Sequence, residues 1–169
     1  MSSLRDDPSN PWWLRKALRE IPHQIAELAD QFDERAARAR PASGDWSAIE
    51  ILGFLAESER EDLRAVEAMI AEDGAPIEEQ RAHLAPGERD FAGQPAWRLL
   101  EDFLRLREEL LWNLEFLEAE WQHGGVHPYR GRISLLRYLR EMSDRDLEAS
   151  IMLRRLSERR TQPVGPRRG

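Results

Sequence analysis

The 169-residue sequence predicts an all-α four-helix bundle. Apolar residues recur at helical spacing in four separate regions, and no region alternates apolar with polar residues as a half-buried strand does. Each helical region carries roughly three apolar positions in seven, as core-facing bundle helices do. We expect one helical domain over residues 1–160 and a disordered tail rich in Arg, Pro and Gly over residues 161–169.

The first helix is expected to begin at Asn10-Pro11, because asparagine is a good N-cap and proline is favoured at the first helical position. Apolar residues follow at three- and four-residue steps from Leu14 to Phe32. Pro22 lies within this run and predicts a kink or a short break, since it removes a backbone donor. The helix should end before Arg40-Pro41.

The second helix has the clearest start in the sequence. Ser47 and Glu50 form a capping-box pattern, and Trp46 with Ile51 matches a hydrophobic staple. We expect this helix to run from Ser47 to about Glu72. The middle of its inner stripe is polar, with Ser58 and Asp62 between apolar residues on both sides.

Two further helices complete the bundle. The third is expected from about Pro95 to Trp121, and Arg107 interrupts its apolar line. The fourth is expected to open near Ser134, and Arg145 falls on its inner side. Charged residues therefore lie at inner positions of both helices.

The connection between the second and third helices has about 20 residues, from Gly74 to Pro95, and a short helix around Ile77–Leu84 fits this segment. At ~3.3 Å per residue it could extend over about 60 Å, whereas a 26-residue helix is about 39 Å long. It can therefore return along the whole bundle, which predicts an up-down-down-up order. A simple up-down order stays open.

The composition excludes several classes of function. Acidic residues outnumber basic ones, 32 to 25, which argues against general nucleic-acid binding. There is no cysteine, so thiolate chemistry and disulfides are excluded. We find no membrane-spanning run and no signal-peptide pattern, and we expect a cytoplasmic protein that does not bind membranes. The preference for arginine over lysine is typical of a GC-rich, bacterial genome.

Three motifs in order resemble those of the DinB-like (YfiT-like) family of four-helix-bundle metalloproteins. They are Arg40-Pro41 followed by Asp45-Trp46-Ser47 and Glu50-Ile51-Leu52-Gly53; Phe103 with Arg107; and His127-Pro128 with Gly131, followed by Ile133–Leu136 and Arg145–Ala149. The resemblance covers about Leu14 to Leu156. It implies a bundle with zinc or nickel held by three histidines in a central cleft.

The family's histidine positions correspond here to Phe54, Arg145 and Ala149, and none of these side chains can ligate a metal in the normal way. We therefore expect no metal and no other cofactor. The remaining histidines are His23, His83, His123 and His127. His123 and His127 are four residues apart, but the glycines and proline around them argue against a continuous helix, so we expect no three-ligand site. His127 is expected to fix its loop by hydrogen bonding.

The former metal cleft is the candidate binding site, formed by Phe54, Glu57, Arg107, Arg145 and Ala149. A buried guanidinium needs hydrogen-bonded partners, and Glu57 is the first candidate to pair with Arg145. Alternatively, the fourth helix is rotated, so that Arg145 faces solvent and Asp146 or Ala149 lies inward. Arg107 and Arg145 could also bind a small anionic ligand. The acidic run from Glu57 to Asp62 is interpreted as a solvated face.

We expect no catalytic residues, because no phosphate-binding loop or nucleophile elbow is present. The first hypothesis is a non-catalytic module that binds a small molecule or another protein, in the latter case as a homodimer that packs through helix faces, as the resemblance implies. Trp12, Trp13 and Trp112 would suggest an interface if they are exposed and clustered. The second is a metal-dependent enzyme of the thiol S-transferase or isomerase type with an unrecognised site. The third is a metal-free enzyme that holds an acidic substrate in the arginine pocket.

Overall fold

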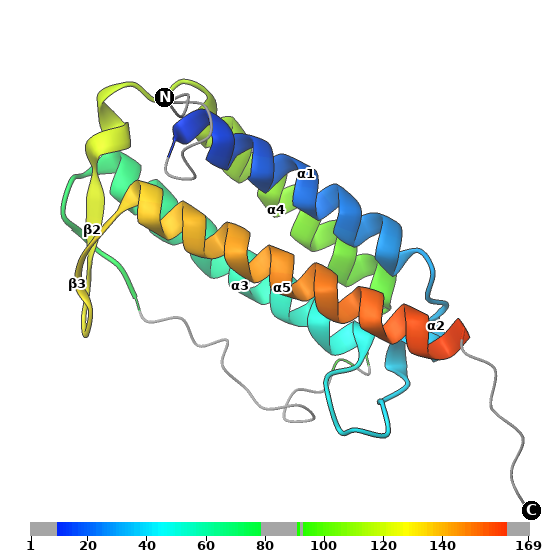
Figure 1. Ribbon diagram of the computed structural model, residues 1–169. Coiled ribbons are helices and arrows are strands. Elements are labelled where there is room, and N and C mark those ends of the chain that lie inside the picture. The colour runs from blue at the N-terminus through cyan, green and yellow to red at the C-terminus, as the bar shows by residue number, and fades with distance from the viewer. Residues whose placement is uncertain (1–9, 79–90, 92, 162–169) are drawn as a thin grey trace, which may run out of the picture.

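The computed structural model describes residues 10–78, 91 and 93–161, and in this part of the chain four long helices form a bundle (Figure 1). They are α1 (Pro11–Ala29), α3 (Ala48–Ala71), α4 (Ala96–Glu115) and α5 (Leu135–Thr161). A short helix, α2 (Glu34–Arg38), precedes α3. The predicted all-α class is confirmed.

The capping residues expected from the sequence begin the first two long helices. The Asn10 side chain accepts a hydrogen bond from the Trp12 amide at 2.9 Å, and Ser47 accepts one from the Glu50 amide at 3.4 Å. Of the kink or short break predicted at Pro22, the break is wrong, because α1 continues through Pro22 to Ala29. The chain beyond Ala29 does not extend α1, since Asp33 caps α2 as a separate helix.

The helices run in the predicted up-down-down-up order. The colour gradient in Figure 1 shows α3 and α4 running in one direction and α1 and α5 in the other. Contacts agree: Arg15 near the start of α1 pairs with Glu115 at the end of α4 at 2.5 Å. Residues 72–95 therefore connect opposite ends of the bundle.

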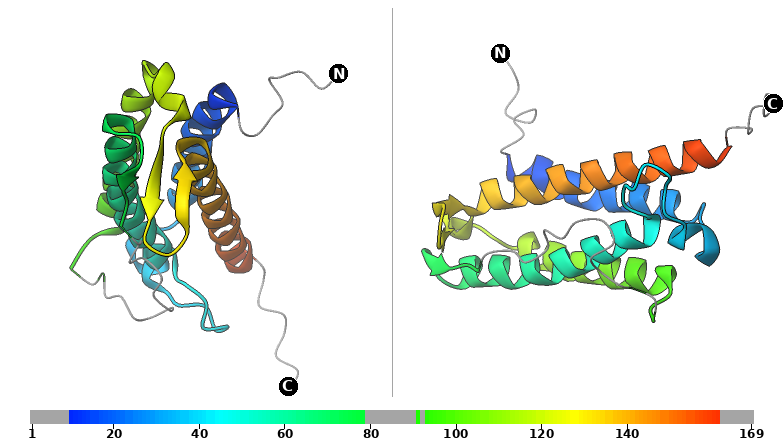
Figure 2. Two further views of the ribbon diagram at one scale, coloured as in Figure 1. Left: turned by 90° about the vertical axis from the view of Figure 1, so that its left-hand side faces the viewer. Right: turned by 90° about the horizontal axis from the view of Figure 1, so that it is seen from below.

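A small sheet closes one end of the bundle (Figure 2). Strand β1 (Ala75–Pro76) pairs in parallel with β2 (Gly124–His127), which pairs antiparallel with β3 (Gly131–Ser134). The sequence predicted no strands, and this prediction is wrong for residues 75–76, 124–127 and 131–134. These strands are too short and too rich in glycine and proline to show an alternating pattern.

The third helix is shorter than predicted. It ends at Glu115 instead of Trp121, and a 3₁₀ turn, η2 (Ala119–Gln122), leads into β2. The Trp121 indole donates a hydrogen bond to the Leu117 carbonyl at 2.9 Å and fixes this turn.

The hydrophobic core is divided into two halves along the bundle axis. One half contains Leu52, Phe103 and Leu153, and the other contains Leu18, Leu110 and Leu139. Between them, the middles of α3, α4 and α5 contribute buried polar side chains: Ser58, Glu59, Asp62, Arg107, Ser143 and Asp146. A polar layer thus crosses the centre of the bundle.

Two predictions fall outside the described residues: the tail, apart from Thr161, and most of the short helix expected around Ile77–Leu84. Among the helices that the structure does describe, none has the length and apolar character needed to cross a membrane.

Candidate functional site

The polar layer contains a cluster of five ionisable residues that we call the ionic layer: Glu59 and Asp62 from α3, Arg107 from α4, and Arg145 and Asp146 from α5. The side chains of Glu59, Asp62 and Asp146 are fully buried, whereas those of Arg107 and Arg145 are 2% and 14% exposed. The expectation that Glu57 to Asp62 form a solvated face is therefore wrong for Glu59 and Asp62.

Arg107 joins all four long helices. Its Nε and Nη2 donate to the two carboxylate oxygens of Glu59, each at 2.7 Å. Its Nη1 donates to Asp146 at 2.7 Å and to the Leu18 carbonyl of α1 at 3.0 Å. The guanidinium also lies 5.2 Å from the centre of the Phe103 ring. The two parallel hydrogen bonds from Arg107 to Glu59 form the bidentate fork that is typical of arginine–carboxylate pairs.

Arg145 pairs with Asp62, not with Glu57 as first expected. Its Nη1 donates to Asp62 Oδ2 at 2.5 Å, and the Tyr138 hydroxyl donates to the other oxygen of Asp62 at 2.8 Å. Its Nη2 lies 3.6 Å from Glu59 and 3.7 Å from Asp146. The alternative with Arg145 facing solvent is wrong, although Asp146 and Ala149 do lie inward.

Burial and the neighbouring opposite charges shift the pKa values in the ionic layer in opposite directions. Burial raises the pKa of Glu59 above its ordinary value, and the fork with Arg107 works against that rise. Burial alone would lower the pKa of Arg107, but Glu59 and Asp146 raise it. The same holds for the pKa of Arg145, which Asp62 raises most strongly against the effect of burial. Both arginines therefore stay protonated.

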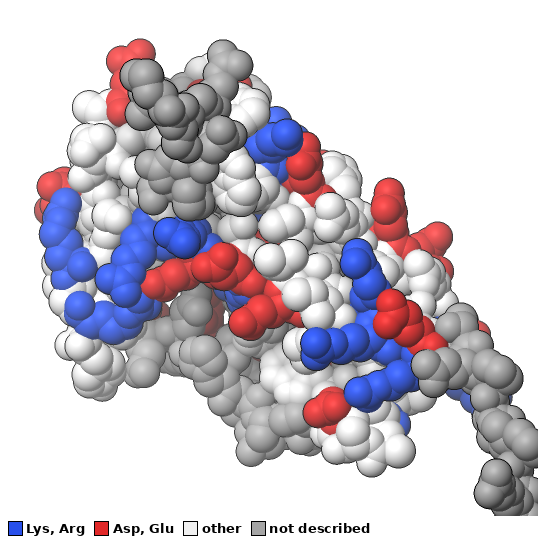
Figure 3. All heavy atoms as spheres, in the orientation of Figure 1, with Lys and Arg blue, Asp and Glu red and all other residues white. Residues whose placement is uncertain are grey.

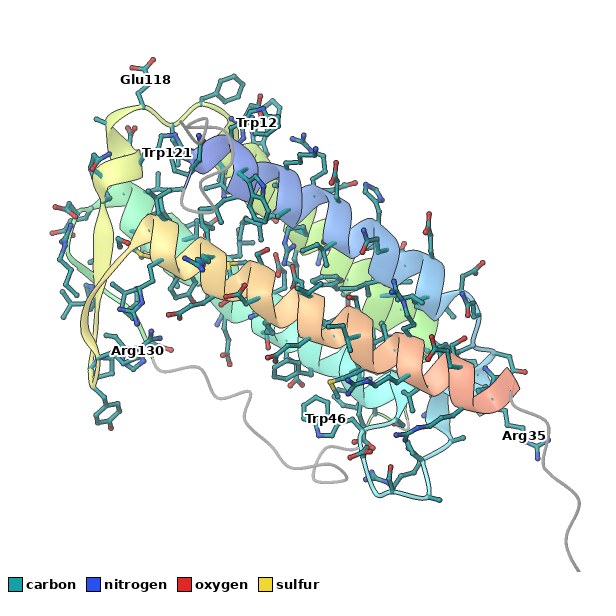
Figure 4. The ribbon with its side chains drawn as sticks, in the orientation of Figure 1. Trp12, Arg35, Trp46, Glu118, Trp121 and Arg130 are labelled. Carbon is teal, nitrogen blue, oxygen red and sulfur yellow. The ribbon has the colours of Figure 1, made fainter. Side chains whose placement is uncertain are left out.

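A cavity of about 760 Å³ borders the ionic layer between α3 and α5 and reaches the β2–β3 hairpin. Figure 4 shows Trp46 and Arg130, which mark its apolar and hairpin ends. Its apolar wall consists of Trp46, Ile51, Phe54, Met142, Ala149 and Met152. Arg145, Asp62 and Tyr138 also line it. The cavity therefore combines an apolar wall with polar groups that are already hydrogen-bonded.

The structure brings three of the five predicted site residues to this cavity. Phe54, Arg145 and Ala149 line it, which is the arrangement that the resemblance implies for the three metal-ligand positions. Arg107 is not part of its lining, because it lies inside the ionic layer. Glu57 is also outside the lining.

These residues do not fit a three-histidine metal site. The Phe54 ring packs edge-on against Trp46, with centroids 5.1 Å apart. A phenyl ring, a methyl group and a protonated guanidinium offer no lone pair to a metal. Within the described ranges, no group of three or more His, Asp or Glu side chains is placed to hold a metal ion.

The hairpin is held against the bundle by polar contacts. Arg130 donates to both oxygens of Glu141 on α5, at 2.9 and 2.5 Å. His127 accepts hydrogen bonds at Nδ1 from the Tyr129 and Arg130 amides, at 3.1 and 3.2 Å. The hydrogen-bonding role expected of His127 is therefore confirmed, and this side chain also lines the cavity.

The fold is similar to that of a solved structure, YfiT from Bacillus subtilis, described as a probable metal-dependent hydrolase with an unusual four-helix bundle topology. The superposition has a TM-score of 0.78 and covers 91% of this chain and 89% of that chain, with 16% sequence identity. At this identity the likeness establishes a YfiT-like fold. No protein-family model and no curated protein matches the sequence.

Proposed function

We propose that this YfiT-like bundle is a non-catalytic module that binds a small molecule in the α3–α5 cavity without a metal. The observation that carries the proposal is the Arg145–Asp62 pair at 2.5 Å on the cavity wall. A protonated arginine occupies a position where the resemblance implies a metal ligand, and a fixed cation there repels a divalent ion.

The shape and lining of the cavity support a ligand site. Protein pockets for small molecules usually have volumes of about 300–1,000 Å³ and are mostly apolar, with a few placed polar groups. This cavity falls in that range at about 760 Å³. Its polar groups are held in place, because Asp62 is bound by both Arg145 and Tyr138. A ligand would thus meet a preorganised wall.

The second candidate is a metal-dependent enzyme, and the observation that favours it is the fold shared with YfiT. It requires ligands other than Phe54, Arg145 and Ala149. It predicts one tightly bound metal per chain and an activity that chelation abolishes.

Two measurements test the proposal. Elemental analysis of untagged protein, after exposure to zinc and nickel and removal of free metal, should find no stoichiometric metal, and neither metal should raise the melting temperature. A screen of cationic, neutral and anionic fragments by NMR should find molecules that shift the amide signals of Phe54 and Ala149. One metal per chain would favour the enzyme, and a screen in which no fragment moves these signals would overturn the binding proposal.

A further inference from the structure

We propose that the ligand of the α3–α5 cavity is a small organic cation with an apolar body, such as a substituted ammonium. This inference rests on the function proposed above and adds the charge class of the ligand. It follows from which charged groups of the lining are already neutralised and which are not.

The two arginines in the described part of the lining are engaged by carboxylates. Arg145 donates to Asp62, and Arg130 donates to both oxygens of Glu141. The Nε and Nη2 atoms of Arg145 are buried and have no hydrogen-bond acceptor, but Nη2 lies 3.6 Å from Glu59 and 3.7 Å from Asp146, so carboxylates surround this end of the guanidinium as well. The positive charges expected to attract an anion are therefore already compensated.

The uncompensated charges are negative. Among the residues that the structure describes, the lining contains five carboxylates and two guanidinium groups, an excess of three negative charges. Glu78, Asp144 and Glu148 account for that excess, since no described residue donates a hydrogen bond to them or forms an ion pair with them. Figure 3 shows a short run of acidic side chains beside a hollow, with basic side chains at both ends of the run. A recess with a net negative charge concentrates cationic ligands.

The apolar side chains of the lining suit the apolar part of such a ligand. Trp46 and Phe54 form an edge-to-face pair at one end of the cavity. Aromatic faces attract ammonium groups, and this attraction is strongest for tryptophan. Met142 and Met152 add adaptable apolar surface. A cation that carries an aromatic or alkyl group can therefore contact the aromatic wall while its charge faces the acidic rim.

The test compares three probes of similar size: benzyltrimethylammonium, benzyl alcohol and benzoate. Each is titrated into the full chain at low salt while the amide signals of Phe54 and Ala149 are followed by NMR. We expect the cation to bind most tightly and to weaken when salt is added. Replacing Asp144→Asn together with Glu148→Gln should weaken the affinity for benzyltrimethylammonium by about fivefold for each charge removed.

The matched control is Glu101→Gln with Glu109→Gln, two exposed positions on α4. It removes the same net charge away from the cavity and should leave the affinity unchanged. Binding of benzoate or benzyl alcohol at least as tight as that of the cation would overturn the charge class and leave the cavity as a binding site. Failure of all three probes to shift the cavity signals would count against both proposals.

Discussion

Replacing Arg107→Met should be the most damaging single change in the ionic layer. Methionine keeps most of the apolar stem but removes the group that binds Glu59, Asp146 and the Leu18 carbonyl. Removing one partner of a buried ion pair costs about 3–5 kcal/mol, and an unsatisfied buried carbonyl adds about 1 kcal/mol. A loss of about 4–6 kcal/mol is a large part of the usual total stability of about 5–15 kcal/mol.

Urea denaturation followed by circular dichroism measures this loss. The matched control is Arg105→Met on the same helix, where the arginine is exposed and lies 3.9 Å from Asp102; it should change the free energy of unfolding by no more than about 0.5 kcal/mol. Arg107→Lys keeps the charge without the fork and should fall between the two. If Arg107→Met costs no more than Arg105→Met, the assigned role of the ionic layer is wrong.

The loss should also depend on pH. Burial already raises the pKa of Glu59, and without the guanidinium nothing of comparable strength opposes that rise. The folded variant then holds the Glu59 proton to a higher pH than the unfolded chain does. The stability gained from this proton is lost as pH rises through the folded-state pKa. The deficit of Arg107→Met relative to the wild type should therefore be smaller near about pH 5 than near about pH 8.

Two further predictions concern the end of the bundle closed by the sheet. Gly124→Ala should destabilise the fold by about 1–3 kcal/mol, because its Cβ would lie 2.6 Å from the Ile133 carbonyl oxygen on the paired strand. In the same urea assay Gly93→Ala, where the Cβ meets nothing within 4 Å, should be nearly neutral, and equal effects would contradict the packing argument. The hydrogen bond from Arg130 lowers the pKa of Glu141. The Arg130–Glu141 pair therefore stabilises the fold above the ordinary carboxyl pKa, and this stabilisation is lost as pH falls through the lowered pKa. Wild-type stability should fall in that acid range, and Glu141→Gln should show a shallower fall; identical slopes would exclude this role.

The sequence predicted the elements with strong local signals. Ser47 caps α3 as expected, and the polar middle of its stripe, Ser58 and Asp62, is buried. Arg107 and Arg145 lie at inner positions of their helices, also as predicted. These predictions succeeded because a helix start and a helix face are determined by residues within a few positions of one another.

The sequence did not reveal Glu59 or the sheet. Glu59 lies four residues after Leu55 and three before Asp62, on the flank of the same inner stripe, but its charge was interpreted as part of a solvated face. It is buried because α3 packs against both α4 and α5 and so buries two flanks. Its partner Arg107 could be found from the sequence, because this arginine interrupts a line of apolar residues. The sheet pairs Ala75 with Gly125, and this distant contact has no local pattern to predict it.

The two arginines of the ionic layer have different roles: Arg107 stabilises the bundle, and Arg145 forms part of the cavity wall. Arg107 is inside the bundle and holds four helices in register, so changes there should be measured as stability. Arg145 lies at the boundary, with one hydrogen bond to Asp62 and one face on the cavity. Because Tyr138 still binds Asp62 when Arg145 is removed, the loss of Arg145 leaves a partly satisfied carboxylate facing the cavity. That change would add negative charge to an already acidic wall, and it should strengthen the binding of a cation while costing less stability than the loss of Arg107.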